Sequence, residues 1–259
     1  MNIFIYDKTF EGLLTVVFDS YDLKIIPDRI VSNDNLQEVL FSGKHEVISD
    51  ADKVKRVLKG LSRRLSEEGC RRLYRAHLSE QEEADMLIFK QIRNVFSKNF
   101  NIEKDYSDEL VLGIKNLSRR VSREACRMIE FVRFQKTADN IYFSPVSPDY
   151  NVLPLIGSHF RNRFPDQQWV IYDMKRKYGL FYNLKEVSEI TIDKGYFNAL
   201  TGRVGEAVLN GDEKQFQCLW KEYFNSITIR ERKNLKLQMH FMPKKYRRFL
   251  TEMNSEVSQ

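Results

Sequence analysis

The hydrophobic and polar positions of this chain follow a helical period over most of its length. Apolar residues recur three or four positions apart, which places them on one face of a helix. This spacing predicts helices over residues 10–21, 50–65, 68–78, 81–100, 108–137, 152–164, 212–226 and 244–253. Thr9 is well placed to cap the first of them, and the pattern over 108–137 allows one break near residues 118–123.

Shorter segments have the alternation and the flanking turn residues of β-strands. Asn2–Tyr6 is the first, and the segment around Phe143 is another. Trp169–Asp173 and Gly179–Tyr182 flank a turn and predict a β-hairpin. Less regular extended segments cover residues 25–31, 46–49 and 187–192. We therefore expect an α+β protein that is mainly helical, with small β elements comprising an N-terminal strand and a central hairpin.

The composition is that of a globular protein, with 259 residues of which 42% are hydrophobic and 30% charged. This length allows one large domain or two small ones. We expect an N-terminal strand–helix region at residues 1–80, a C-terminal helical unit with the hairpin at 81–250, and a polar tail at 251–259. No linker is rich in Pro, Gly or Ser, so we expect these regions to pack closely.

Apolar runs and cysteines bear on the compartment and on cofactors. No run approaches the ~20 apolar residues of a membrane span, so no membrane association is expected. Asp7 and Lys8 interrupt the start of the chain, which does not resemble a signal peptide. Cys70, Cys126 and Cys218 are far apart, as is typical of reduced, part-buried thiols in a cytoplasmic protein. Without a CxxC pair or a cysteine cluster, we predict no zinc, no iron–sulfur centre and no other cofactor.

An internal echo accompanies the positive net charge of +6. Residues 61–71 (LSRRLSEEGCR) and 117–127 (LSRRVSREACR) agree at eight of eleven positions, which suggests a duplicated helical unit. In the second copy, cations four residues apart share one helical face: Lys115, Arg119, Arg123 and Arg127. Arginine can bind phosphate through two hydrogen bonds, so this stripe could contact nucleic acid. The alternative is a solvated face with local ion pairs.

A second candidate site surrounds the predicted hairpin. His159 and Arg163 are four residues apart on one helix, Asp173 ends the following strand, and Arg176 lies in the turn. If the helix packs on the hairpin, these side chains could meet and bind phosphate. His159 and Asp173 could then serve proton transfer. The simpler interpretation is a buried polar network that fixes the helix to the hairpin.

The C-terminal region carries further positive charge. Pro243 opens a short helix whose cations include Lys244 and Arg247, which could contact phosphate, although the helix could equally turn an aromatic face inward. Gly202–Gly205 matches the GxxG loop of KH domains, but its surroundings do not follow the KH order and we interpret it as a turn. P-loop, Rossmann, zinc-protease and serine-hydrolase motifs are absent from the sequence.

Three stretches of the chain resemble a known bacterial family. They are YDKTFEGLL at 6–14, DYNVLPLIGSHFRNRFPDQQWVIYDMKRKYGLFY at 149–182, and the region 219–246 with LWKEYF, IRERKN and MPKKY. Together they are similar to DNA-metabolism proteins encoded beside a radical-SAM enzyme of the DNA repair or modification type. The C-terminal region of that family also occurs fused to uracil-DNA-glycosylase-like domains. The chain departs from the family at Lys8, where glycine is expected, and at Arg247, where an aromatic residue is expected.

The resemblance implies an accessory protein of DNA repair or modification that binds DNA and the neighbouring radical-SAM enzyme. That partner would perform the radical chemistry, because this chain has no cysteine cluster for the iron–sulfur centre. Two alternatives stay open. One is a nucleic-acid-processing enzyme that uses the cluster around His159 and Asp173, and the other is a protein–protein scaffold without DNA contact.

Overall fold

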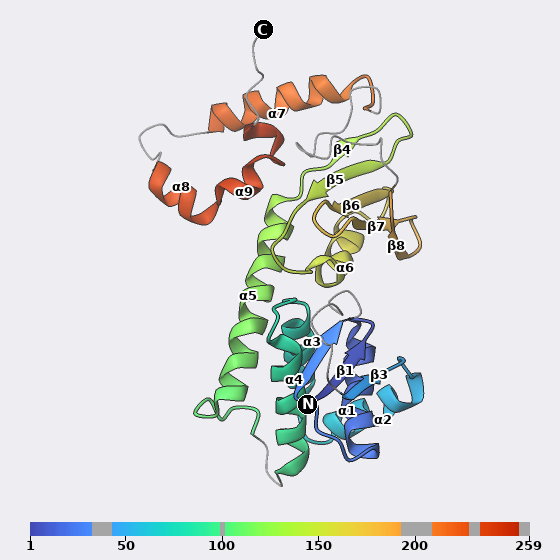
Figure 1. Ribbon diagram of the computed structural model, residues 1–259. Helices are drawn as coiled ribbons and strands as arrows, with labels where there is room; N and C mark the ends of the chain where they lie inside the picture. Colours follow the sequence, from blue (N-terminus) through green and yellow to red (C-terminus); the bar gives the residue numbers. More distant parts are fainter. Residues whose placement is uncertain (33–42, 99–101, 193–208, 228–233, 254–259) are drawn as a thin grey trace. The chain divides into compact units, whose positions relative to one another are not determined.

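The computed structural model describes residues 1–32, 43–98, 102–192, 209–227 and 234–253 (Figure 1). The chain forms two compact units, unit 1 at Met1–Ser122 and unit 2 at Arg123–Gln259. Each unit has its own small sheet, and helices account for most of the regular structure. The predicted fold class, α+β and mainly helical with small β elements, is confirmed.

Unit 1 is built on a three-stranded parallel sheet. Its strands are β1 (Asn2–Tyr6), β2 (Arg29–Ser32) and β3 (Gly43–Glu46), in the order β2-β1-β3. β1 was predicted, and it proves to be the central strand. It is buried from residue 3 to residue 6 because both of its faces are covered, as is usual for a parallel sheet.

Four amphipathic helices of unit 1 share a core with this sheet. They are α1 (Phe10–Asp22), α2 (Ala51–Ser62), α3 (Glu67–His77) and α4 (Ala84–Ser97). Thr9 caps α1 as predicted, since its side chain accepts a hydrogen bond from the backbone N–H of Gly12. The boundary expected at residue 80 lies between α3 and α4, both of which contribute apolar side chains to this one core.

The two copies of the internal echo have different structures. Residues 61–71 include the end of α2, a turn and the start of α3, where Ser66 is the N-cap. Residues 117–127 lie inside α5 (Glu109–Phe131), a single helix without the break that the sequence allowed. The Glu103 carboxylate accepts hydrogen bonds from the backbone N–H and hydroxyl of Ser66, which anchors the interruption in the first copy. The expectation of a duplicated helical unit was therefore wrong.

Unit 2 contains a five-stranded mixed sheet in the order β4-β5-β6-β7-β8. The strands are β4 (Gln135–Lys136), β5 (Tyr142–Val146), β6 (Trp169–Asp173), β7 (Tyr178–Tyr182) and β8 (Val187–Ile190). The predicted hairpin is confirmed as the antiparallel pair β6–β7. Helix α6 (Leu153–Arg163) connects β5 to its parallel neighbour β6 and packs against β7 and β8.

The ends of the predicted segments changed most in unit 2. The helix expected to reach residue 137 stops at Phe131, because β4 pairs with β5 directly afterwards. The helix expected at 244–253 is divided into α9 (Lys244–Arg247) and the 3₁₀ turn η4 (Thr251–Met253). Helix α7 (Glu213–Ile227) was predicted, whereas α8 (Leu235–Phe241) was not. The GxxG tetrapeptide 202–205 and the tail from residue 254 lie outside the described residues.

The cysteines were expected to be part-buried, and this holds for Cys70 alone. Cys126 and Cys218 are exposed, because each occupies the solvent face of its helix. Burial raises the pKa of the Cys70 thiol, which favours its neutral form.

Candidate nucleic-acid interface

The most connected polar site of unit 2 lies at one edge of its sheet. β5 and β6 are parallel, so their carboxyl ends meet at the same edge. β5 continues into the loop 147–152, and β6 continues into the turn 174–177. Both segments carry polar side chains, and they lie within reach of each other for this topological reason.

Asp173 organises the turn that follows β6. One carboxylate oxygen accepts hydrogen bonds from the backbone N–H groups of Lys175 (2.8 Å) and Arg176 (3.2 Å). The other oxygen lies 2.8 Å from Nη1 of the Arg176 guanidinium. Asp173 is 0% exposed, so this ion pair and these hydrogen bonds compensate for the loss of water around its charge.

The side chains of that turn reach back to the loop after β5. The Arg176 guanidinium donates to the carbonyl oxygens of Pro148 (3.2 Å) and Asp149 (2.9 Å). Lys175 Nζ donates to the same Asp149 carbonyl, at 2.9 Å. Two cations from one turn therefore converge on a single peptide of the loop.

Glu124 of α5 connects the same loop to α9. Its Oε1 atom accepts hydrogen bonds from the Asp149 backbone N–H (2.7 Å) and from the Tyr246 hydroxyl (2.6 Å). Lys245 forms an ion pair with the Asp149 carboxylate and lies 3.6 Å from Glu124. Burial, together with the Glu124 carboxylate, raises the pKa of Tyr246 well above its ordinary value, so its hydroxyl remains a hydrogen-bond donor.

These contacts define one site, here called the Asp149 cluster. Its members are Glu124, Asp149, Asp173, Lys175, Arg176, Lys245 and Tyr246. It joins four segments that are distant in sequence: α5, the loop after β5, the β6–β7 turn and α9 (Figure 1). The sequence singled out two of these seven residues as site residues, Asp173 and Arg176.

Exposed cations project from the four segments that the cluster holds together. We call them the unit-2 basic surface: Arg123, Lys175, Lys177, Lys244 and Arg248. The two nearby carboxylates, Glu124 and Asp149, are already engaged within the cluster. Arg127 and Arg247 are half-buried, and Arg247 Nε donates to the Met242 carbonyl at 3.3 Å.

The predicted His159, Arg163, Asp173 and Arg176 site is only partly assembled. Asp173 and Arg176 are paired, as described above. His159 and Arg163 are exposed on α6, where His159 contacts the ring of Phe160 and Arg163 lies over the ring of Phe164. Within the part of the chain that the structure describes, no hydrogen bond or ion pair joins His159 or Arg163 to Asp173 or Arg176.

The arginine stripe lies on one continuous helix, but its residues differ in environment. Lys115 and Arg119 belong to unit 1, and Arg123 and Arg127 belong to unit 2. Lys115 Nζ lies 3.5 Å from the centre of the Tyr106 ring, a cation–π contact that holds it against its own unit. Arg119 and Arg123 are exposed.

The N-terminal motif that contributes to the family resemblance has a structural explanation in unit 1. Asp7 follows β1 and accepts hydrogen bonds from Thr9 and from the Ser49 hydroxyl. Lys8 has a φ of 62°, a left-handed conformation that suits the glycine expected at this position. Gly12 must lack a side chain, because a Cβ atom would lie 2.2 Å from Asp7 Oδ1.

Sequence reasoning missed Glu124, Asp149, Lys245 and Tyr246 as site residues. Asp149 begins the central stretch of the family resemblance, which was the available signal. Glu124 follows the stripe residue Arg123 and is buried, although charged residues in such a helix are mostly solvated. Only the neighbouring α9 explains its burial.

Searches for other chemistry in the described ranges found little. No group of three or more His, Cys, Asp or Glu side chains there is arranged to hold a metal ion. The helices in those ranges do not combine the length and apolarity that crossing a bilayer requires.

Fold and site together define an α+β protein whose second unit presents a cation-rich surface around a buried polar cluster. Residues 82–252 match a family described as a domain of unknown function, DUF4130, and the chain belongs to this family. No curated protein sequence matches. A solved structure of a pGpG-specific phosphodiesterase, PggH, from Vibrio cholerae is similar at 10% identity and a TM-score of 0.32. The match covers 88% of this chain and 99% of that one.

Proposed function

We propose that this protein binds nucleic acid through the unit-2 basic surface and serves as an accessory factor in DNA repair or modification. The observation that carries the proposal is the convergence of α5, the β6–β7 turn and α9 on Asp149. Their exposed cations are thereby held on connected segments, while the nearby carboxylates are used internally. A polyanion offers phosphates to such a surface, and lysine and arginine bind them without reading sequence.

The role in DNA repair or modification, and the radical-SAM enzyme as partner, are supported by the resemblance of three stretches of the sequence. On this proposal the partner carries out the radical chemistry, and this chain holds the nucleic acid. Co-purification of the two proteins, with and without DNA, tests the partnership. Retention of the partner without any DNA binding would favour the scaffold alternative instead.

The catalytic alternative, with His159 and Asp173 acting together, stays a prediction that the described contacts do not favour. Asp173 is buried and already accepts hydrogen bonds from two backbone N–H groups and one guanidinium. His159 is exposed on another element. Turnover of a damaged oligonucleotide that His159→Ala abolishes without unfolding the protein would restore this alternative.

The decisive experiment for the proposal is a salt-dependent DNA titration. Binding of a labelled duplex and a labelled single strand is measured by fluorescence anisotropy between about 50 and about 200 mM salt. The test variant carries Arg123→Glu, Lys177→Glu and Lys244→Glu, three exposed residues with no described hydrogen bond or ion pair. We expect weaker binding to both probes and a smaller slope of log K against log salt, by about 0.9 for each lost phosphate contact.

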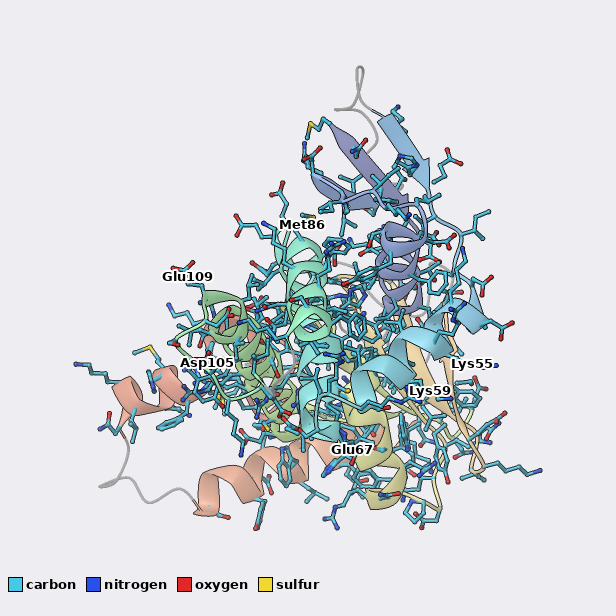
Figure 2. The ribbon with its side chains drawn as sticks, turned by 90° about the horizontal axis from the view of Figure 1, so that it is seen from below. Lys55, Lys59, Glu67, Met86, Asp105 and Glu109 are labelled. Atoms are coloured by element: carbon cyan, nitrogen blue, oxygen red, sulfur yellow. The ribbon has the colours of Figure 1, made fainter. Side chains whose placement is uncertain are left out.

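A charge-matched control uses the other unit. Lys55 and Lys59 project from α2, as Figure 2 shows, and Lys90 is exposed on α4. Lys55→Glu, Lys59→Glu and Lys90→Glu change the net charge by the same amount, and we expect this variant to keep most of the affinity and the slope. Equal losses in both variants would mean that only overall charge matters. An unchanged test variant would remove the unit-2 basic surface from the mechanism.

A further inference from the structure

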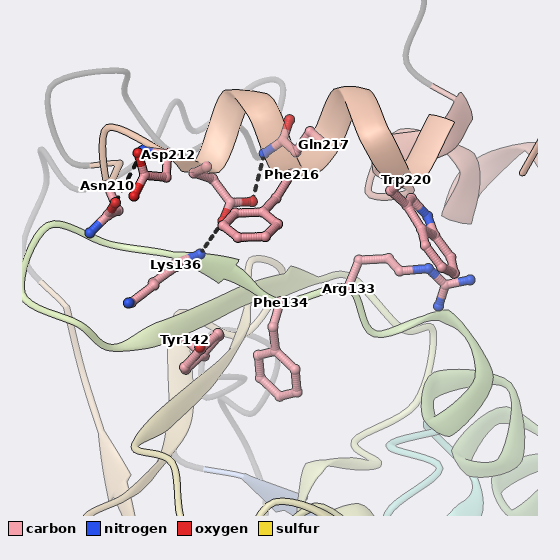
Figure 3. Close-up of a pocket in the computed structure, with 10 residues that line it drawn as sticks. Arg133, Phe134, Lys136, Tyr142, Asn210, Asp212, Phe216, Gln217 and Trp220 are labelled. Carbon is pink, nitrogen blue, oxygen red and sulfur yellow. Dashed lines mark hydrogen bonds between the residues drawn. The ribbon is translucent and has the colours of Figure 1, made fainter. Parts of the chain in front are cut away.

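A separate feature of unit 2 is a pocket of about 390 Å³ between α7 and the β4–β5 edge of the sheet (Figure 3). Its lining residues are Arg133, Phe134, Lys136, Tyr142, Asn210, Asp212, Glu213, Phe216, Gln217 and Trp220. This volume lies within the range of about 300–1,000 Å³ that is usual for small-molecule sites.

Two buried carboxylates build the pocket by tying the segment before and within β4 to α7. Glu252 is 2% exposed at its side chain, accepts two hydrogen bonds from the Arg133 guanidinium and accepts one from the Trp220 indole. Glu213 accepts hydrogen bonds from the Lys136 backbone N–H and from the Gln217 amide (Figure 3). The side chains of Arg133, Trp220 and Gln217 are therefore fixed before any ligand arrives.

Aromatic side chains on α7 are exposed at this pocket. Phe216 is 63% exposed and Trp220 is 40% exposed, although both are large and apolar. Trp220 also stacks on Tyr223, with ring centres 5.6 Å apart. Tyr142 adds a third ring to the lining from β5, at the opposite side. Exposed flat rings around a hollow are the usual platform on which proteins stack unpaired bases.

The polar groups of the lining supply a hydrogen-bond donor and an acceptor. The Asn210 carbonyl oxygen accepts from the Asp212 backbone N–H, which leaves its NH₂ group as a donor. The Gln217 NH₂ group donates to the Glu213 carboxylate, which leaves its carbonyl oxygen as an acceptor. Every nucleobase presents both kinds of group on its edge, so this pair of amides suits a base without selecting one.

The charges of the lining limit how many phosphates the pocket accepts. Arg133 and Lys136 are balanced by Asp212 and Glu213, so no excess of positive charge is available for a di- or triphosphate. In the described part of the chain, no hydrogen bond or ion pair engages the Lys136 ammonium group. One free cation fits one phosphodiester group.

From these features we infer that the pocket between α7 and the β4–β5 edge binds a single unpaired nucleotide of a nucleic-acid strand. The base stacks on Phe216 and Trp220, the amides of Asn210 and Gln217 contact its edge, and Lys136 contacts its phosphate. Glu252 and Glu213 are positioning residues. The inference rests on the proposed function, since the unit-2 basic surface would hold the rest of the strand.

Tryptophan fluorescence of the full chain gives a direct test. The chain has two tryptophans, and Trp169 is 1% exposed in the core, so a ligand in the pocket is expected to quench Trp220. The probes are the four deoxynucleoside monophosphates and a single-stranded oligonucleotide containing 2-aminopurine, a fluorescent base. We expect saturable quenching of Trp220 by the monophosphates and of 2-aminopurine by the protein.

Phe216→Ala is the key variant, because so exposed a side chain can be removed without loss of the fold. Stacking of one base on one ring contributes about 1–3 kcal/mol, so we expect its affinity for both kinds of probe to fall by roughly 5- to 150-fold. Leu219→Ala, on the same helix and outside the pocket, should bind like the unaltered protein. Trp220→Phe should remove the tryptophan signal while 2-aminopurine still reports binding.

The outcomes separate this inference from the proposed function. Phe216→Ala binding as tightly as the unaltered protein, or no saturable quenching by any probe, overturns the pocket. The triple variant of Arg123, Lys177 and Lys244 should lose duplex binding and still bind the monophosphates. Monophosphate binding by a protein that binds no polymer would overturn the proposed function and leave the pocket as a nucleotide site.

Discussion

Asp7 of unit 1 and Asp173 of unit 2 occupy comparable positions and have opposite environments. Each lies at the carboxyl end of a strand with a parallel neighbour, and each accepts backbone hydrogen bonds from the turn that follows. Asp7 is exposed, and its other partners are the hydroxyls of Thr9 and Ser49. Asp173 is fully buried, and its other partner is the guanidinium of Arg176.

The difference teaches what a strand-terminal aspartate does in each unit. Hydroxyls stabilise a carboxylate that stays at the surface, so Asp7 orders its own turn and the start of α1. A guanidinium permits complete burial, and its remaining N–H groups are free to bind a second segment. Arg176 uses them on the Asp149 loop, so the turn after β6 becomes part of a larger site.

The largest expected effect is on the buried pair. Asp173→Ala leaves the Arg176 charge buried without its partner and should lower the free energy of unfolding of unit 2 by about 3–5 kcal/mol. Asp7→Ala removes hydrogen bonds at an exposed site and should cost about 1 kcal/mol. Urea unfolding monitored by tryptophan fluorescence reports unit 2, where both tryptophans lie, and far-UV circular dichroism follows both units. Similar costs for the two alanines would break the comparison.

A smaller effect is expected where the Asp149 cluster is joined to α9. Tyr246→Phe removes the hydroxyl that donates to the buried Glu124 carboxylate, and we expect a loss of about 2 kcal/mol. Tyr178→Phe is the matched control, since its hydroxyl contacts the neutral amide of Asn151 and should cost about 1 kcal/mol. The same fluorescence-detected unfolding measures both. Tyr178→Phe proving the more costly would mean that Glu124 is not the anchor of α9.

The smallest effect concerns pH and Asp7. Burial alone would raise the pKa of its carboxyl, but the hydrogen bonds from Thr9 and Ser49 outweigh it and hold the pKa below its ordinary value. A lowered folded-state pKa gives stability that is fully present above the unfolded value of about 3.9 and is lost as the pH falls through the folded value.

Asp7→Asn tests this pH dependence directly. Hydrogen exchange of the α1 amides, followed by mass spectrometry across the acid range, should show protection falling with pH in the unaltered protein and falling less in the variant. Identical pH profiles would show that the hydrogen bonds to Asp7 do not depend on its charge.

Periodicity alone determined much of this protein. The apolar stripes of α1 to α4 and α6, the Thr9 cap and the β6–β7 hairpin were all predicted, because each depends on residues close together in the chain. The end of α5 was not, because β4 forms only when β5 is available as its partner. The two copies of the echo differ for a similar reason, since Glu103 stabilises the turn in one of them.

The candidate sites show the same division. The sequence identified cations on α5, in the hairpin turn and near α9, since charge is visible residue by residue. Only the tertiary structure decided that Glu124 is buried, that Asp149 collects contacts from three other segments, and that two carboxylates shape the pocket beside α7. Burial and convergence depend on neighbours that are distant in sequence, and no local pattern records them.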